Sequence, residues 1–165
     1  MGSGKSFVGR KLSKILDLPF IDLDQLLEQT YHLSVNDFFN RYGEDAFRQA
    51  ERSILLSTEQ LITGIISTGG GTPCYYDNMS WMKANGYTVY LRMNAKALCY
   101  RLKESKKPRP LIRDLGSNDL LPFIEAKLIE REVFYSQADL VYQGENLSVS
   151  AFAERLSGIN DLVRF

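Results

Sequence analysis

The sequence has little of what several large classes of protein need. Its 165 residues include a single histidine, His32, and only two cysteines, Cys74 and Cys99. One histidine nearly excludes a histidine-based catalytic triad or a multi-histidine metal centre, and the cysteine spacing matches no zinc or redox motif. We therefore expect proton chemistry to fall to carboxylates, lysine or water. We expect both thiols to be buried and reduced, as is usual in the cytoplasm.

An excess of charge and a long apolar run are also missing. Twenty basic residues balance twenty acidic ones, so no overall field attracts nucleic acid or an anionic membrane. No apolar run approaches the ~20 residues that span a bilayer, and the start of the chain lacks the pattern of a signal peptide. The length and the ordinary apolar content of 44% predict one domain over 1–165, with no nucleic-acid or membrane partner.

Helical and extended patterns alternate along the chain. The predicted helices cover 4–16, 24–31, 44–61, 76–84, 95–103, 120–136 and 148–159, and the predicted strands cover 20–22, 64–67, 88–91 and 140–142. This alternation predicts an α/β domain with a mostly parallel sheet. The polar, basic stretch 104–118 has no clear period, and we expect it to form a mobile lid over a substrate.

The chain opens with a glycine-rich turn directly before a helix, and the turn reads Gly2, Ser3, Gly4, Lys5 and Ser6. In a phosphate-binding loop of this type, backbone N–H groups surround the phosphates, the lysine reaches the terminal phosphates, and the serine binds Mg²⁺. The segment therefore indicates a nucleotide such as ATP. The alternative is a flexible glycine-serine terminus in front of an unrelated helix.

Two carboxylates, Asp22 and Asp24, follow the apolar start of the predicted strand 20–22. Residues two apart in a strand point to the same face, so both side chains could reach one site. Ligands of open α/β sheets bind beyond the carboxyl ends of the strands, which is where this pair lies. The alternative for Asp24 is that it only caps the next helix.

Glycines and arginines supply the remaining candidates. Gly69, Gly70 and Gly71 follow a predicted strand, where a ligand can lie against the main chain or the chain can simply turn. Arg48 and Arg131 lie on different predicted helices and together suit a carboxylate, although each alone resembles a solvated surface charge. Within the basic stretch, Arg109 could neutralise a transferring phosphoryl group or belong to a solvated loop.

Taken in order, these segments resemble shikimate kinase. The matching segments are MGSGKS at 1–6, FIDLD at 20–24, FRQAE at 47–51, STGGGTP at 67–73, RPLI at 109–112, and ER followed by tyrosine at 131–135. The resemblance implies transfer of the ATP γ-phosphate to the 3-hydroxyl of shikimate, on the pathway to aromatic amino acids. It also implies a three-layer P-loop kinase fold, whose parallel sheet has the strand order 2-3-1-4-5, and a monomer.

The resemblance implies roles for the residues around the phosphates. Gly2, Ser3 and Gly4 would form the ATP loop with Lys5, which is also catalytic. Ser6 and Asp22 would hold Mg²⁺. Further nucleotide contacts would come from Arg101, Arg109 and Gln143, with Arg109 also stabilising the transferred phosphate.

The resemblance also implies an acceptor site. Asp24 would orient or deprotonate the acceptor hydroxyl, so it is both a catalytic and a substrate-binding residue. Arg48 and Arg131 would bind the shikimate carboxylate, while Gly70 and Gly71 would line the pocket.

The start of the chain departs from the family pattern, because the first, central strand and the first glycine of the loop are missing before Met1. We therefore expect the native protein to extend upstream of Met1. Two alternatives to shikimate phosphorylation remain at this point. One is another small-molecule kinase of the same fold, acting on gluconate or a nucleotide, and the other is an impaired ATP-binding remnant.

Overall fold

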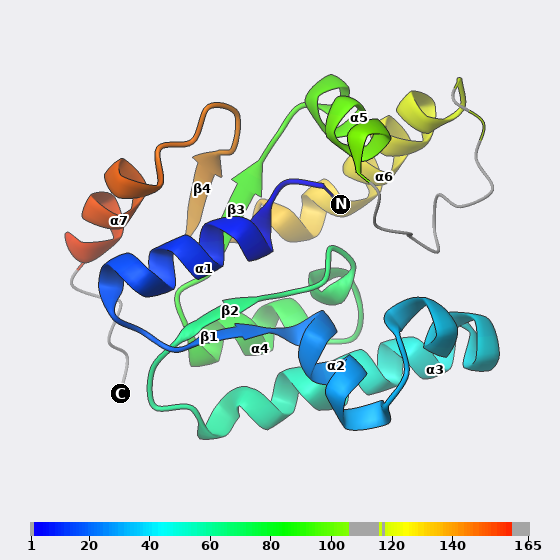
Figure 1. The fold of residues 1–165 in the computed structure, drawn as a ribbon, viewed down its shortest axis with the longest axis horizontal. Coiled ribbons are helices and arrows are strands. Elements are labelled where there is room, and N and C mark those ends of the chain that lie inside the picture. Colours follow the sequence, from blue (N-terminus) through cyan, green and yellow to red (C-terminus); the bar gives the residue numbers. More distant parts are fainter. Residues whose placement is uncertain (1, 106–115, 117, 160–165) are drawn as a thin grey trace.

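The computed structural model describes residues 2–105, 116 and 118–159, over which helices and strands alternate (Figure 1). The helices are α1 (Lys5–Leu16), α2 (Leu23–Tyr31), α3 (Val35–Ser57), α4 (Asn78–Asn85), α5 (Ala95–Glu104), α6 (Leu120–Tyr135) and α7 (Val149–Ser157). The strands are β1 (Phe20–Asp22), β2 (Ile65–Ser67), β3 (Val89–Arg92) and β4 (Leu140–Gln143), and the short 3-10 helices are η1 (Thr58–Gln60) and η2 (Thr72–Cys74). The predicted alternation of elements is confirmed.

The four strands form two parallel pairs. β1 pairs with β2, so that Asp22 lies opposite Ser67, and β3 pairs with β4, so that Arg92 lies opposite Gln143. Among the described residues, no strand lies between β2 and β3. The two pairs fit the outer pairs 2-3 and 4-5 of the expected order. Because parallel strands end at the same edge, the first pair brings the segments after β1 and β2 together.

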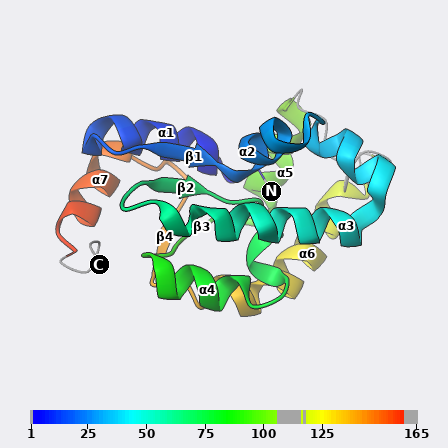
Figure 2. The same ribbon diagram turned by 90° about the horizontal axis from the view of Figure 1, so that it is seen from below.

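Helices cover both faces of the strands. Figure 2 shows α1 on one side of the strands and α4 and α6 on the other. Leu12 of α1, Leu91 of β3 and Phe152 of α7 belong to one apolar core. A second core joins α2 to α3, and a third joins α5 to α6. These three cores fix the helix ends that surround the site.

The long helix α3 differs from the predicted 44–61. It begins at Val35, where the hydroxyl of Ser34 accepts a hydrogen bond from the backbone N–H of Asp37 at 3.0 Å. At Gly43 the backbone leaves helical geometry, with φ 80° and ψ 177°, and the helix then continues to Ser57. The cap at Ser34 therefore starts an additional segment that ends in a break. The chain turns into η1 after Ser57 instead of continuing as α-helix.

The predictions about the cysteines, a membrane span and the lid have different outcomes. Cys99 is buried and free, as expected, whereas Cys74 is free but only half-buried. In the described part of the chain, no helix combines the length and the apolar character that a bilayer span needs. Most of the predicted lid, 106–115 and 117, lies outside the described residues, and Arg109 lies there with it.

Candidate active site

The loop before α1 has the backbone geometry of an anion site. Gly2 and Gly4 have φ values of 69° and 88°, in the left-handed region that glycine adopts without strain. Gly4 is the N-cap of α1, and no side chain of the described residues caps the helix there. The first N–H groups of α1 can therefore face an anion at the positive end of the helix dipole. Lys5 and Ser6 lie in this first turn, as phosphate binding requires.

The predicted nucleotide residue Arg101 contacts this loop from α5. Its Nη1 donates to the backbone oxygen of Ser3 and to the sulfur of Met93, both at 3.2 Å. Met93 in turn packs closely on the segment after β4, because a Cβ at Gly144 would lie 2.9 Å from its Cγ. The structure thus connects Arg101 with the phosphate loop and, through Met93, with the segment that begins at Gln143.

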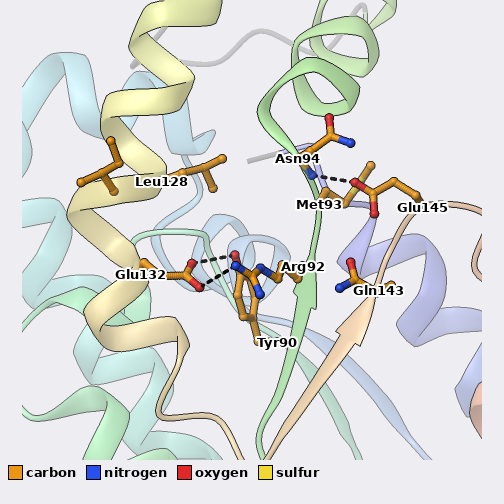
Figure 3. A pocket seen from close by; sticks show the side chains of 9 residues that line it. Tyr90, Arg92, Met93, Asn94, Leu128, Glu132, Gln143 and Glu145 are labelled. Carbon is orange, nitrogen blue, oxygen red and sulfur yellow. Dashed lines mark hydrogen bonds and ion pairs between the residues drawn. The ribbon is translucent and has the colours of Figure 1, made fainter.

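A hollow of about 460 Å³ lies beside Gln143 at the ends of β3 and β4 (Figure 3). Glu132 of α6 accepts a hydrogen bond from the hydroxyl of Tyr90 at 3.2 Å and pairs with Arg92 at 3.6 Å. Burial, followed by the charge of Glu132, raises the pKa of Tyr90, so this phenol stays protonated. The charged groups on this wall therefore already have partners.

Asp22 and Asp24 are arranged differently from the prediction. Asp22 ends β1 and is the N-cap of α2, because its Oδ1 accepts from the backbone N–H groups of Asp24 at 3.1 Å and Gln25 at 3.4 Å. Asp24 lies in the first turn of α2. The prediction of one shared strand face is therefore wrong, since the strand ends at Asp22. The alternative that Asp24 caps the helix is wrong too, because Asp22 does so.

The oxygen atoms predicted to hold a metal lie at one strand edge. Ser6 Oγ lies 3.4 Å from the hydroxyl of Ser67, the residue that pairs with Asp22 across β1 and β2. The described residues contain no group of three or more histidine, cysteine or acidic side chains that could hold a metal. A hydroxyl with one carboxylate fits Mg²⁺, which keeps several waters and binds mainly through substrate phosphates. The donor set therefore suits a cation that arrives with the nucleotide.

The glycine segment after β2 is packed too tightly for side chains. A Cβ at Gly69 would overlap Oε1 of Glu51 and lie 3.4 Å from Oδ1 of Asp24. A Cβ at Gly71 would lie 2.6 Å from Nη1 of Arg48. Close approach of charged groups to the main chain explains these glycines better than a loose turn does. Asp24 and Arg48 therefore border the same stretch of backbone.

Arg48 is buried with two acidic partners on its own helix, and its side chain is 5% exposed. Nη1 pairs with Glu51 at 2.8 Å, Nη2 pairs with Glu44 at 3.0 Å, and the guanidinium lies 4.2 Å from the ring centre of Tyr75. Burial opposes the charge of Arg48, but its pairs with Glu51 and Glu44 outweigh burial and raise its pKa. Arg48 is therefore a fixed cation rather than a solvated one.

Arg131 approaches the same place from α6. It is 5% exposed, and no carboxylate of the described residues forms an ion pair with it. One turn further, the hydroxyl of Tyr135 donates to the backbone oxygen of Gly70 at 2.5 Å. Burial raises the pKa of the Cys74 thiol, while the charges of Arg131 and Arg48 both lower it. Because Tyr135 of α6 holds Gly70 and Arg48 of α3 packs against Gly71, the two helices bring their arginines toward the same glycine segment.

A buried network behind Arg48 was not predicted from the sequence. Thr72 Oγ1 donates to Oε1 of Glu51 at 2.7 Å, and Asn78 Nδ2 donates to the backbone oxygen of Thr72 at 2.8 Å. Thr72 and Asn78 are both fully buried. The helical spacing of Glu44, Arg48 and Glu51 is a signal that could have identified the two acidic partners.

We expect Thr72→Val to destabilise the protein by about 1–3 kcal/mol, because the buried carboxylate of Glu51 loses a donor while side-chain volume is kept. Urea unfolding measures this loss. Thr30→Val is the matched control, because the exposed hydroxyl of Thr30 donates within its own helix, to the backbone oxygen of Leu26 at 2.8 Å. A variant with Thr72→Val that is as stable as the control would remove the structural role assigned to this hydrogen bond.

Comparisons with known proteins give one consistent result. The protein-family model described as Shikimate kinase matches residues 1–158. Shikimate kinase of Parabacteroides distasonis is 41% identical over 147 residues, which cover 89% of this chain and 85% of that protein. The crystal structure of shikimate kinase from Bacteroides thetaiotaomicron superposes with a TM-score of 0.89 at 36% identity, covering 95% of this chain and 92% of that one. The structure of shikimate kinase from Acinetobacter baumannii in complex with shikimate gives a TM-score of 0.84 at 26% identity, covering 95% and 86%.

Proposed function

This chain belongs to the shikimate kinase family, and from that premise we propose how its residues divide the reaction between them. The chain phosphorylates shikimate with ATP as co-substrate. We assign the 3-hydroxyl of shikimate as the acceptor of the γ-phosphate, following the family resemblance. The predicted P-loop kinase fold is confirmed by the solved relatives.

The observation that supports the acceptor site best is the convergence of Arg48 and Arg131. Arg131 is 5% exposed and has no carboxylate partner among the described residues, which is costly for a cation, and an anionic ligand removes that cost. Shikimate carries a single carboxylate, which a guanidinium grips bidentately. The glycine segment supports this site, because Gly70 is held by Tyr135 and Gly71 packs against Arg48.

The nucleotide side is built on the loop before α1. Gly2, Ser3 and Gly4 would direct their backbone N–H groups to the phosphates, and Lys5 would bind the terminal phosphates. Arg101 would hold the loop through Ser3, and Gln143 would border the nucleotide beyond Met93.

Ser6 and Asp22 are the residues that would hold Mg²⁺. The cap bonds of Asp22 use Oδ1 alone. Within the described residues this leaves Oδ2 to face a water of a hydrated cation. When bound, Mg²⁺ supplies charge neutralisation on the phosphates.

Catalysis would then rest on positioning and on charge. Asp24, in the first turn of α2 and against the glycine segment, would accept the proton or a hydrogen bond from the acceptor hydroxyl. Arg109, which lies outside the described residues, would stabilise the transferred phosphate from the lid at 104–118. Closure of that lid would exclude water, so that shikimate rather than solvent receives the phosphate.

An acceptor comparison tests this assignment. We expect turnover of shikimate, roughly 100-fold lower kcat/KM for its methyl ester because the arginines lose their anion, and no comparable turnover of gluconate or nucleoside monophosphates. Equal rates on acid and ester would contradict the carboxylate site. Faster turnover of gluconate or a nucleotide would favour another kinase of this fold, and ATP binding without any turnover would favour the impaired remnant.

The assembly and the compartment are also proposals. We propose that 1–165 acts as a single domain and as a monomer, because all the residues assigned to the site come from one chain. A cytoplasmic location is supported by the free Cys74 and Cys99. Size-exclusion chromatography with light scattering would test the monomer.

A further inference from the structure

Two carboxylates hold the guanidinium of Arg48, and they differ in exposure and in how firmly they are fixed. Glu51 is 4% exposed, accepts from Nη1 at 2.8 Å, and is fixed from behind by the hydroxyl of Thr72. Glu44 is 42% exposed and lies one helical turn before Arg48. Both acidic residues touch the arginine that is assigned to the acceptor carboxylate, but only Glu51 is locked in place.

Glu44 binds Arg48 through a single oxygen atom. Oε1 accepts from Nε at 3.3 Å, from Nη2 at 3.0 Å, and from the hydroxyl of Tyr75 at 2.7 Å. A bound carboxylate that presents two oxygens to the same edge makes a stronger, bidentate contact. The hydrogen bond from Tyr75 and the charge of Arg48 keep the pKa of Glu44 below its usual value despite partial burial, so Glu44 is an anion at neutral pH.

The backbone next to Glu44 gives it room to move. Gly43 interrupts α3 with φ 80° and ψ 177°, and apart from its chain neighbours and the nearby helix backbone, no heavy atom of the described residues lies within 4 Å of the position that a Cβ would take there. Glu44 is thus the first residue after a break in an otherwise continuous helix. Its exposed side chain can leave Arg48 without disturbing the core, whereas Glu51 cannot.

The local charges make such a movement necessary. Glu44 and Glu51 both pair with Arg48, so this guanidinium faces two negative charges, whereas Arg131 has no ion pair among the described residues. With Glu44 in place, an incoming carboxylate meets an arginine whose charge is already balanced and an anion on its Nε–Nη2 edge. Two carboxylates competing for one guanidinium repel each other.

Building on the proposed carboxylate site, we infer that Glu44 is a displaceable counter-ion that sets the affinity of the acceptor site. It occupies Arg48 in the empty protein and leaves when the acceptor carboxylate binds. The affinity for an acidic acceptor is therefore lower by the free energy of this exchange. Glu44 acts through Arg48 and takes no part in the phosphoryl transfer itself.

Glu44→Gln tests this role because it keeps the size of the side chain and removes its charge. We expect the KM for shikimate to fall about two- to five-fold, which corresponds to the loss of a partly exposed ion pair worth up to ~1 kcal/mol. We expect kcat and the KM for ATP to stay unchanged. Asp45→Asn is the matched control, since it removes the same charge from the adjacent, exposed position and should change neither KM.

Tyr75→Phe provides a second measurement. It keeps the ring on which Arg48 stacks and removes the hydroxyl that holds Glu44, so the KM for shikimate should fall in the same direction by a smaller factor. Combining Glu44→Gln with Tyr75→Phe should give no further fall. An unchanged or raised KM in Glu44→Gln would instead make Glu44 a positioning residue for Arg48 and would overturn the proposal.

The methyl ester of shikimate separates failure of this inference from failure of the proposed site. If the wild-type protein prefers acid to ester and Glu44→Gln does not lower the KM for the acid, only the counter-ion role fails. If acid and ester react equally well in the wild type, the carboxylate site itself is wrong and the counter-ion role fails with it. The expected result is a fall in KM for the acid alone.

Discussion

Replacing Arg131 by methionine should lower kcat/KM for shikimate roughly 100- to 1,000-fold, the cost of removing one partner of a buried, hydrogen-bonded charge pair. Most of the loss should appear in KM, because the carboxylate is bound in the ground state as well as in the transition state. Steady-state kinetics with shikimate varied at saturating ATP measures this effect. The dissociation constant for ATP, measured by titration calorimetry, should stay near the wild-type value.

The same variant should also lose the preference for acid over ester. Its remaining activity on shikimate and on the methyl ester should differ far less than in the wild type, because half of the guanidinium pair is gone. Arg131→Lys should fall between wild type and Arg131→Met, since lysine keeps the charge and loses the planar fork. If Arg131→Met still preferred the acid as strongly as the wild type, the carboxylate would bind elsewhere.

Arg131→Met should not unfold the protein. Arg131 is buried without a carboxylate partner among the described residues, so removing its charge leaves no acidic group stranded and removes a desolvation cost. We expect a thermal midpoint equal to or above that of the wild type. Arg48 differs, because its removal would leave Glu51 buried and unpaired.

The backbone geometry of the loop before α1 could be predicted from a local sequence pattern. Gly2, Gly4, Lys5 and Ser6 are adjacent in sequence, and the geometry they need is set by φ values that glycine alone adopts easily. The strand at 20–22 and the glycine turn after β2 were predictable for the same reason. In each case a few neighbouring residues determine the local backbone, so no information from distant segments is needed.

The acceptor site could not be predicted from local patterns, because it depends on how distant segments of the chain pack together. Each arginine alone resembles a surface charge in the sequence, whereas the structure buries both Arg48 and Arg131, which lie on different helices and more than 80 positions apart. Their burial depends on how α3 and α6 each pack against η2, which no local pattern encodes. The counter-ion role proposed for Glu44 is also hard to predict from the sequence. It depends on the break in α3 at Gly43 as much as on the spacing of Glu44 from Arg48.

The error at Asp22 and Asp24 has a specific cause. Strand alternation predicts one face for both residues, but Asp22 accepts hydrogen bonds from the backbone N–H groups that start α2, and the helix begins at Leu23. A short polar side chain at a strand end competes for such N–H groups, and aspartate is among the best N-caps. The carboxylate of Asp22 therefore binds the backbone of Asp24 instead of sharing a strand face with its side chain. Their roles separate, with Asp22 shaping the turn and Asp24 facing the glycine segment.

Asp24→Asn should lower kcat about 100- to 10,000-fold, the range for removing a general base or a hydrogen-bond acceptor that acts on the reacting hydroxyl. Asparagine keeps the size of the side chain and the hydrogen bond from its backbone N–H to Asp22, so α2 should stay capped. Rapid-quench and steady-state assays at saturating shikimate and ATP measure the effect.

The KM for ATP should change little, because Asp24 lies against the acceptor side at Gly69 and not in the loop at 2–6. Asp37→Asn is the control, since Asp37 is an exposed carboxylate in the first turn of α3 and should leave kcat unchanged. A kcat within threefold of wild type in Asp24→Asn would mean that phosphoryl transfer needs no carboxylate at this hydroxyl. Positioning by the arginines and neutralisation of phosphate charge would then have to account for the whole rate.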